Sequence, residues 1–105
     1  QPLAAKDEPG EYQPTSFTLS AFPNPFNSST TITFGLGDPR LREEAPMRLD
    51  VYDTQGRLVT ELMNGLLKAG EHKVVWEAAG APAGLYLIQL QTAEKAVCQK
   101  VVLLR

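Results

Sequence analysis

The sequence is poor in the residues from which catalytic and metal sites are most often built. Its 105 residues include one cysteine, Cys98, and one histidine, His72. One cysteine excludes an internal disulfide, and one histidine excludes a zinc site of clustered histidine and cysteine ligands and leaves no Ser-His-Asp triad to argue for. Cys98 is interpreted as a strand residue, and His72 as a packed side chain. We therefore expect no enzyme, no metal and no cofactor.

Charge and long apolar runs are also scarce. A formal net charge of −2 offers no basic field for nucleic-acid phosphates, so we expect no nucleic-acid partner. No apolar run approaches the roughly 20 residues that span a bilayer. The start, Gln1-Pro2-Leu3, has neither an initiator methionine nor a signal-peptide core, so we expect a piece of a longer protein.

Short apolar segments with polar residues at alternate positions fill most of the chain. Ile32, Phe34 and Leu36 share one face of such a segment, which is typical of a strand with one buried side. Seven short strands at near-regular spacing predict an all-β fold, a seven-stranded antiparallel immunoglobulin-like β-sandwich. We expect the strands at 17–19, 30–36, 47–51, 58–63, 72–76, 86–90 and 96–104.

Turn residues and prolines separate these segments. Residues 1–16 hold three prolines and no apolar period, so we expect a flexible linker there and a folded domain at 17–105. Asn64-Gly65 is a strong turn signal. Residues 38–45 are the only segment with helix-forming character, and we expect one or two helical turns at most.

Two groups of polar residues have both a functional and a structural interpretation. The loop Pro23-Asn24-Pro25-Phe26-Asn27 could be recognised directly, but its prolines also make a rigid connection, with Phe26 as a plug of the core. We favour the structural interpretation. Asp50 and Asp53, with Asp38, could collect calcium, but their spacing lacks a regular ligand pattern, and we expect solvated carboxylates.

Five motifs in a fixed order resemble those of a known family. The first is the Pro23 to Asn27 loop before a Thr-rich strand, and the last is Lys100 to Arg105. Between them lie Val51-Tyr52-Asp53 with Gly56-Arg57-Leu58-Val59, Gly70 to Trp76, and Gly84-Leu85-Tyr86. Together they resemble type A C-terminal sorting domains (Por secretion system sorting domains) of the type IX secretion system of Bacteroidetes-like bacteria. The motif residues interpreted as mainly structural are Pro23, Asn24, Pro25, Phe26, Asn27, Gly56, Val59, Gly70, Trp76, Gly84 and Tyr86.

The resemblance implies a non-catalytic secretion signal covalently linked to an N-terminal cargo. It also implies transit of the cargo through the periplasm and recognition of the folded domain by the outer-membrane translocon and shuttle proteins. Removal by a sortase-like surface protease, with residues 1–16 as the cleavage region, would leave the cargo at the cell surface or outside the cell. The candidate residues for translocon recognition are Lys100, Val101, Val102, Leu103, Leu104 and Arg105.

The apolar character of this terminal segment raises two further expectations. An open edge on the last strand would let it join a sheet of the translocon by β-augmentation. The same edge would also allow a homodimer or strand exchange.

Two other functions stay open at this point. A carbohydrate-binding β-sandwich of a secreted polysaccharide-degrading enzyme would use Trp76, Tyr52 or Tyr86 as stacking platforms, which requires exposed, coplanar rings. Period-two alternation instead buries Trp76 and Tyr86. An assembly module similar to the immunoglobulin-like domain of flagellar hook-capping proteins would have a similar strand pattern.

Overall fold

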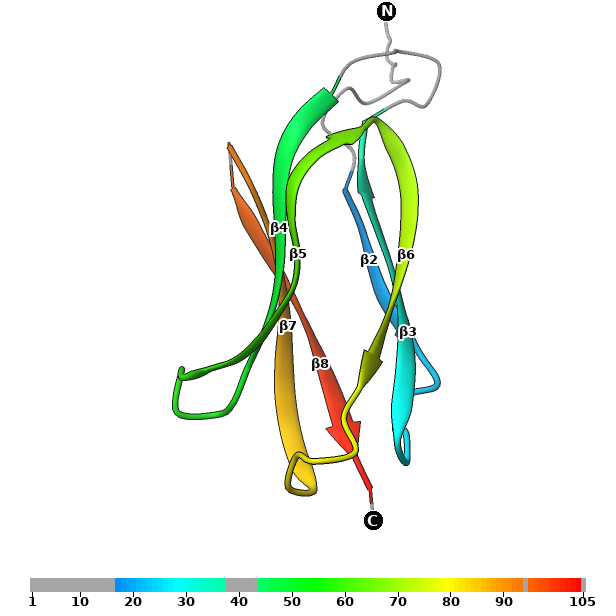
Figure 1. Cartoon of the computed structure of the whole chain (residues 1–105), viewed down its shortest axis with the longest axis vertical. Helices are drawn as coiled ribbons and strands as arrows, with labels where there is room; N and C mark the ends of the chain where they lie inside the picture. Colours follow the sequence, from blue (N-terminus) through cyan, green and yellow to red (C-terminus); the bar gives the residue numbers. More distant parts are fainter. Residues whose placement is uncertain (1–16, 38–43, 94, 105) are drawn as a thin grey trace, which may run out of the picture.

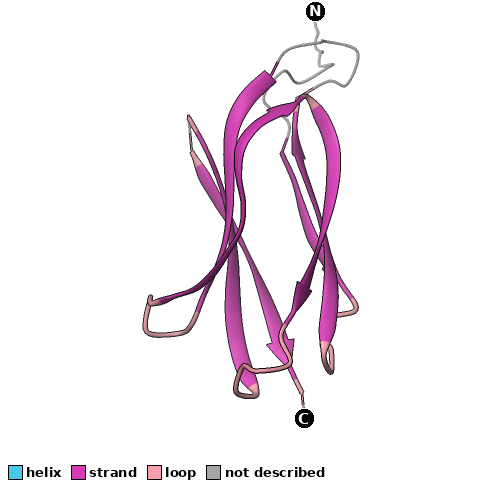
Figure 2. Ribbon diagram, viewed as in Figure 1, coloured by secondary structure: helices cyan, strands magenta, loops and turns pink. Residues whose placement is uncertain are grey.

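The computed structural model describes residues 17–37, 44–93 and 95–104, and every regular element in these ranges is a β-strand (Figure 1, Figure 2). A three-stranded sheet has the order β2-β3-β6, and a four-stranded sheet has the order β5-β4-β7-β8, with antiparallel neighbours throughout. The expected seven-stranded antiparallel immunoglobulin-like β-sandwich is confirmed. The strands are β2 (Phe17–Phe22), β3 (Ser29–Leu36), β4 (Glu44–Tyr52), β5 (Leu58–Lys68), β6 (Gly70–Glu77), β7 (Gly84–Thr92) and β8 (Ala96–Leu103).

Two local expectations are wrong. Asn64-Gly65 is not a turn but lies inside β5, where Asn64 pairs with Arg48 and Gly65 with Met47 of β4. Pairing along a neighbouring strand outweighs the local turn preference of these residues. Glu44 and Ala45 are likewise not helical, since they begin β4 opposite the end of β5.

Other expectations fall on residues that the structure does not describe. The remainder of the expected helical segment, 38–43, lies outside the described residues. The same is true of the expected linker 1–16 and of Arg105.

The core lies between the two sheets and is built from alternate residues of each strand. Ile32 and Ile88 are fully buried, and the single tryptophan, Trp76, is 3% exposed. Trp76 is the largest residue of this core, as the sequence predicted. The buried hydrophobic residues are Phe26, Ile32, Phe34, Met47, Leu49, Val51, Trp76, Ala78, Tyr86, Ile88, Leu90, Val101 and Leu103.

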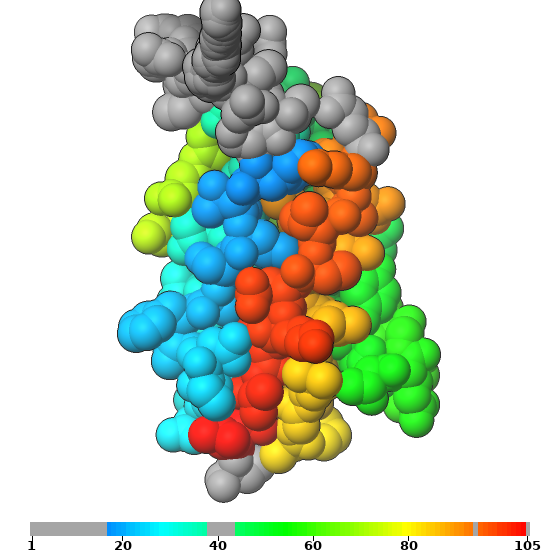
Figure 3. All heavy atoms as spheres, turned by 180° about the vertical axis from the view of Figure 1, so that it is seen from behind, coloured from blue at the N-terminus to red at the C-terminus, as the bar shows by residue number. Residues whose placement is uncertain are grey.

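The sheets are joined differently along their two sides. The chain passes from β5 in one sheet to β6 in the other at Ala69-Gly70. Gly70 has a φ of 113°, and a Cβ atom placed on Gly35 would lie 2.0 Å from the carbonyl oxygen of Gly70. The two glycines let the backbones approach closely at this crossing. On the opposite side, β2 lies beside β8, so the terminal strand reaches the surface there (Figure 3).

Among the described residues, no helix is long and apolar enough to cross a membrane.

Candidate functional site

The terminal strand β8 has a buried face and an outward face. Val101 and Leu103 point into the core and are 0% and 1% exposed. On the other face, Lys100 is exposed, Val102 is half-buried and Leu104, just past the strand, is 46% exposed. β8 is an edge strand of its sheet. The structure therefore covers one face of this apolar strand and leaves the other face open.

The free edge of β8 is partly closed by the Pro23 to Asn27 loop. The side-chain Nδ2 of Asn24 donates to the carbonyl oxygen of Lys100 at 2.9 Å, and the main-chain N–H of Val102 donates to Asn24 Oδ1 at 3.1 Å. Next along the chain, the N–H of Phe26 donates to the carbonyl oxygen of Val102 at 2.9 Å, and the N–H of Leu104 donates to the carbonyl oxygen of Phe26 at 2.7 Å. The segment from Asn24 to Phe26 thus takes the place of a neighbouring strand. We call it the edge clamp.

The edge clamp is fixed to the rest of the sandwich at two points. Phe26 is 2% exposed, and its ring centroid lies 5.4 Å from that of Trp76. The hydroxyl of Thr30, itself buried, donates to the carbonyl oxygen of Pro23 at 2.8 Å. The expectation that Phe26 plugs the core is confirmed. The expectation of an open edge along the whole of β8 is wrong between Lys100 and Leu104, because the clamp pairs with the main chain there.

Most other motif residues hold turns or fill the core. Gly56 and Gly84 have φ angles of 83° and 147°, in the range that favours glycine. Trp76 and Tyr86 are buried, and the Tyr86 hydroxyl donates to the carbonyl oxygen of Pro82. Val59 differs, because it is 39% exposed.

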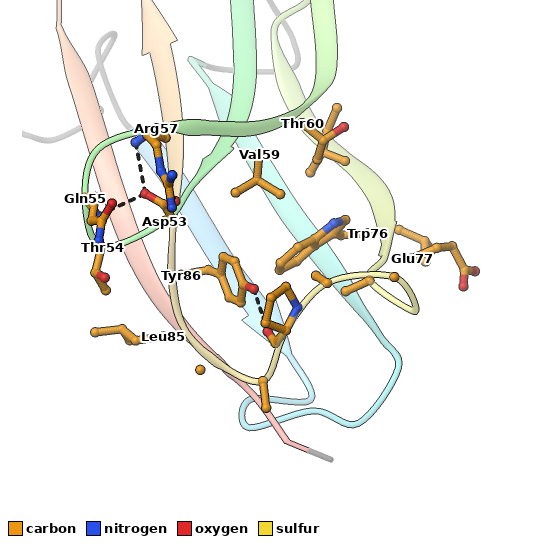
Figure 4. A pocket seen from close by; sticks show the side chains of 18 residues that line it. Asp53, Thr54, Gln55, Arg57, Val59, Thr60, Trp76, Glu77, Leu85 and Tyr86 are labelled. Carbon is orange, nitrogen blue, oxygen red and sulfur yellow. Dashed lines mark hydrogen bonds and ion pairs between the residues drawn. The ribbon is translucent and has the colours of Figure 1, made fainter.

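A hollow of about 750 Å³ lies between the beginning of β5 and the loop from β6 to β7 (Figure 4). Trp76, Tyr86 and Val59 are among the residues that line it. The rings of Trp76 and Tyr86 meet nearly edge to face, with an interplanar angle of 75° and centroids 5.2 Å apart. They are 3% and 5% exposed. They are therefore not the exposed, coplanar platform that sugar stacking requires.

The expectation of solvated carboxylates is wrong for Asp50. This residue is 1% exposed, although it lies on the outward face of β4. Arg48 Nε lies 2.8 Å from Asp50 Oδ2 as an ion pair, and the Tyr52 hydroxyl donates to the same oxygen at 3.0 Å. This hydrogen bond to Asp50, together with desolvation, raises the pKa of Tyr52 above its ordinary value. The side chains of Arg48 and Tyr52 thus cover a carboxylate that the strand alternation placed in solvent.

Asp53 organises the turn between β4 and β5. Its Oδ1 accepts the main-chain N–H groups of Arg57 and Gln55, and its Oδ2 accepts Arg57 Nε at 2.9 Å. The main-chain hydrogen bond from Arg57 is the main cause that lowers the pKa of Asp53 from 3.8, and the hydrogen bond from the Arg57 guanidinium adds to it.

Among the described residues, no group of three or more acidic, histidine or cysteine side chains could hold a metal ion.

The hydrogen bonds of Asn24 to β8 were not predicted from the sequence. Asn24 was recognised only as part of a motif, because the two main-chain groups that its side chain binds are 76 and 78 residues away. A short polar residue between two prolines, two positions before a buried phenylalanine, was the only local signal.

The geometry first defines a class: an immunoglobulin-like β-sandwich whose last strand is an edge strand clamped by the loop between β2 and β3. Comparison with protein families then identifies the family. Residues 20–104 match the secretion system C-terminal sorting domain, and the chain belongs to that family. It is a C-terminal sorting signal of type IX secretion.

A solved structure supports the fold. The chain is similar to dimeric latent PorU from Porphyromonas gingivalis, with a TM-score of 0.68 and 18% sequence identity. The likeness covers 90% of this chain and 10% of the PorU chain, so the chain spans about a tenth of that protein. No curated protein matches the sequence.

Family membership also bears on partners and destination. Sorting domains of this kind are typically non-catalytic, act with secretion machinery on an N-terminal cargo, and send it toward the cell surface or the extracellular space.

Proposed function

We propose that this chain carries an N-terminal cargo through the periplasm and across the outer membrane, and that the translocon binds it through the outward side chains of β8. The observation that supports this is the match of residues 20–104 to the sorting-domain family, combined with the open outward face at the end of that match. The domain itself performs no chemistry in this proposal.

The proposed contact surface combines apolar side chains with one positive charge. Leu85 of β7 is 40% exposed and pairs with Val102, while Leu104 is 46% exposed at the end of β8. Lys100 lies on the same face, opposite Leu87. We call the set Leu85, Lys100, Val102 and Leu104 the outward patch. Exposed apolar side chains beside a charge are suited to a protein partner with an apolar surface and an acidic group.

The mode of binding proposed here differs from simple strand addition. Because the edge clamp already pairs with β8 from Lys100 to Leu104, a translocon strand cannot add there without displacing Phe26 from the core. Contact through side chains on the outward face needs no such displacement. Val101 and Leu103 then contribute by holding β8 in the sandwich.

The remaining partners follow from the same proposal. Residues 1–16 join the sorting domain, 17–105, to the cargo, and a sortase-like surface protease cleaves within them. The shuttle proteins and the translocon meet the domain after it has folded. The cargo ends at the cell surface or in the medium.

A secretion assay tests the proposal. A periplasm-targeted reporter carrying this chain at its C-terminus is expressed in a type IX-competent bacterium and in a translocon-deficient sibling. We expect export only in the competent strain, and a strong loss of export for Leu104→Glu. Leu66→Glu is the matched control, since Leu66 is 64% exposed on β5, away from the outward patch. Equal export of both variants would contradict the proposed contact surface, and retention of the unmodified fusion in both strains would contradict the sorting role.

A further inference from the structure

The edge clamp leaves one short stretch of β8 unpaired. Successive residues of a strand turn their main-chain groups to opposite edges, so Ala96, Cys98, Lys100, Val102 and Leu104 present theirs away from β7. The clamp occupies this edge from the Lys100 carbonyl to the Leu104 N–H. In the described part of the chain, no hydrogen bond reaches the outward main-chain groups of Ala96 and Cys98.

The unpaired stretch could pair with the same stretch of a second copy, except that one main-chain group, the carbonyl oxygen of Lys100, is already hydrogen-bonded. Two copies of β8 placed antiparallel, with Cys98 opposite Cys98 at the two-fold axis, would set Lys100 of each copy opposite Ala96 of the other. This register needs the carbonyl oxygen of Lys100 as an acceptor for the N–H of Ala96. In the structure that oxygen already accepts Asn24 Nδ2 at 2.9 Å, and it also accepts the neighbouring Gln99 Nε2 at the longer distance of 3.1 Å.

We propose that Asn24 is an edge guard that keeps the sorting domain monomeric by denying the Lys100 carbonyl to a second copy of the chain. A primary amide is suited to this task, because its NH2 group can donate and its oxygen can accept on the same side, as the N–H and C=O of a single strand residue do. The Asn24 amide satisfies Lys100 and Val102 as a neighbouring strand would, and it cannot extend the sheet further. Exposed strand edges are sites of unwanted pairing, and proteins protect them with local devices of this kind.

Because the clamp is anchored by Phe26, we expect removal of the Asn24 side chain to leave the rest of the clamp paired with β8. Phe26 stays in the core beside Trp76 and still pairs with Val102 and Leu104 through its main chain. Loss of the Asn24 amide therefore frees the Val102 N–H and leaves the Lys100 carbonyl with one donor, the side chain of its neighbour Gln99. Together with Ala96 and Cys98, these give a second copy a continuous edge.

The test compares Asn24→Ala with Asn27→Ala in the full 105-residue chain. Asn27 belongs to the same loop and is exposed, which makes it a matched control. By light scattering, we expect the wild type and Asn27→Ala to have the monomer mass of 11.5 kDa at all concentrations, and Asn24→Ala to approach twice that mass as concentration rises. Asn24→Asp, which keeps the size and an acceptor but lacks the donor, is expected to dimerise as well and serves if the alanine variant is unstable.

Cys98 reports the register of the dimer, because it is exposed and would face its copy across the two-fold axis. With a mild added oxidant, which takes two electrons and two protons from the thiol pair, a disulfide-linked dimer is expected for Asn24→Ala and not for Asn27→Ala. Adding Cys98→Ser should abolish this cross-link and leave the non-covalent dimer intact.

Hydrogen exchange separates local opening from loss of the fold. Under conditions where Asn24→Ala is monomeric, the Val102 amide should exchange about fivefold to tenfold faster than in the wild type. The Val101 and Leu103 amides, which face β7, should be unchanged. A monomeric Asn24→Ala with no Cys98 cross-link, or a wild type that already dimerises, would overturn the inference. This inference about Asn24 does not depend on the proposed contact between the outward patch and the translocon.

Discussion

The role of Phe26 in joining the loop to the core gives a quantitative prediction. Phe26→Ala removes a ring that is 2% exposed and lies 5.4 Å, centroid to centroid, from the Trp76 ring. Truncation of a buried phenylalanine to alanine costs about 3–5 kcal/mol, since it combines lost burial with a cavity. The main-chain hydrogen bonds to Val102 and Leu104 do not involve the ring, so they add little to this loss. For a domain of this size, the change lowers the melting temperature by about 15–30 °C.

Phe22→Ala is the matched control for this prediction. Phe22 lies four residues earlier at the end of β2 and is 81% exposed, so its truncation should change the free energy of unfolding by no more than about 0.5 kcal/mol. Urea titration followed by the fluorescence of Trp76, the only tryptophan, measures both variants with one core probe. A loss below about 1 kcal/mol for Phe26→Ala would refute the reasoning that this loop is anchored by its phenylalanine.

Three further predictions concern residues away from the clamp. Gly35→Ala should destabilise the fold by about 1–3 kcal/mol or more in urea titration, because its Cβ would lie 2.0 Å from the carbonyl oxygen of Gly70; an unchanged midpoint would contradict the close approach. Asp50→Ala should cost about 1–3 kcal/mol by the same assay, since it removes the acceptor of the half-buried Tyr52 hydroxyl and the nearer of the two carboxylates that pair with Arg48. For Asp53, whose pKa is lowered chiefly by the Arg57 main-chain N–H, the stabilisation is present above pH 3.8 and is lost as the pH falls through the lower, folded pKa. Asp53→Asn should therefore show a shallower loss of stability in acid than the wild type, and equal slopes would count against that hydrogen bond.

Strand alternation was enough to predict the elements that have one covered face. In β7, Tyr86, Ile88 and Leu90 alternate with polar or partly exposed neighbours and are all buried, as period two requires. The same rule was wrong for Asp50, because the cover there comes from side chains on its own outward face. Long neighbours such as Arg48 and Tyr52 can bury a short acid, and alternation alone does not report this.

The candidate site was predictable only in part, for a similar reason. The plugging role of Phe26 followed from one apolar residue in a polar, proline-rich loop. The role of Asn24 did not, because its side chain pairs with main-chain groups on β8, and any sequence at Lys100 and Val102 would offer the same carbonyl and N–H. A hydrogen bond from a side chain to the main chain therefore cannot be inferred from which residue its partner is.

The structure divides the Pro23 to Asn27 motif and the terminal strand into parts with different tasks. Asn24 and Phe26 are both used inside the domain, one on the β8 edge and one in the core. A translocon that bound the Phe26 side chain would have to unfold this end of the sandwich first, at a cost of about 3–5 kcal/mol. One that bound the Asn24 amide would have to break its two hydrogen bonds to β8. A translocon could bind Lys100 and Leu104 without that cost, because their side chains already face solvent in the folded domain. In the proposed mode of recognition, the loop therefore contributes to sorting indirectly, because it fixes the strand that carries the outward patch.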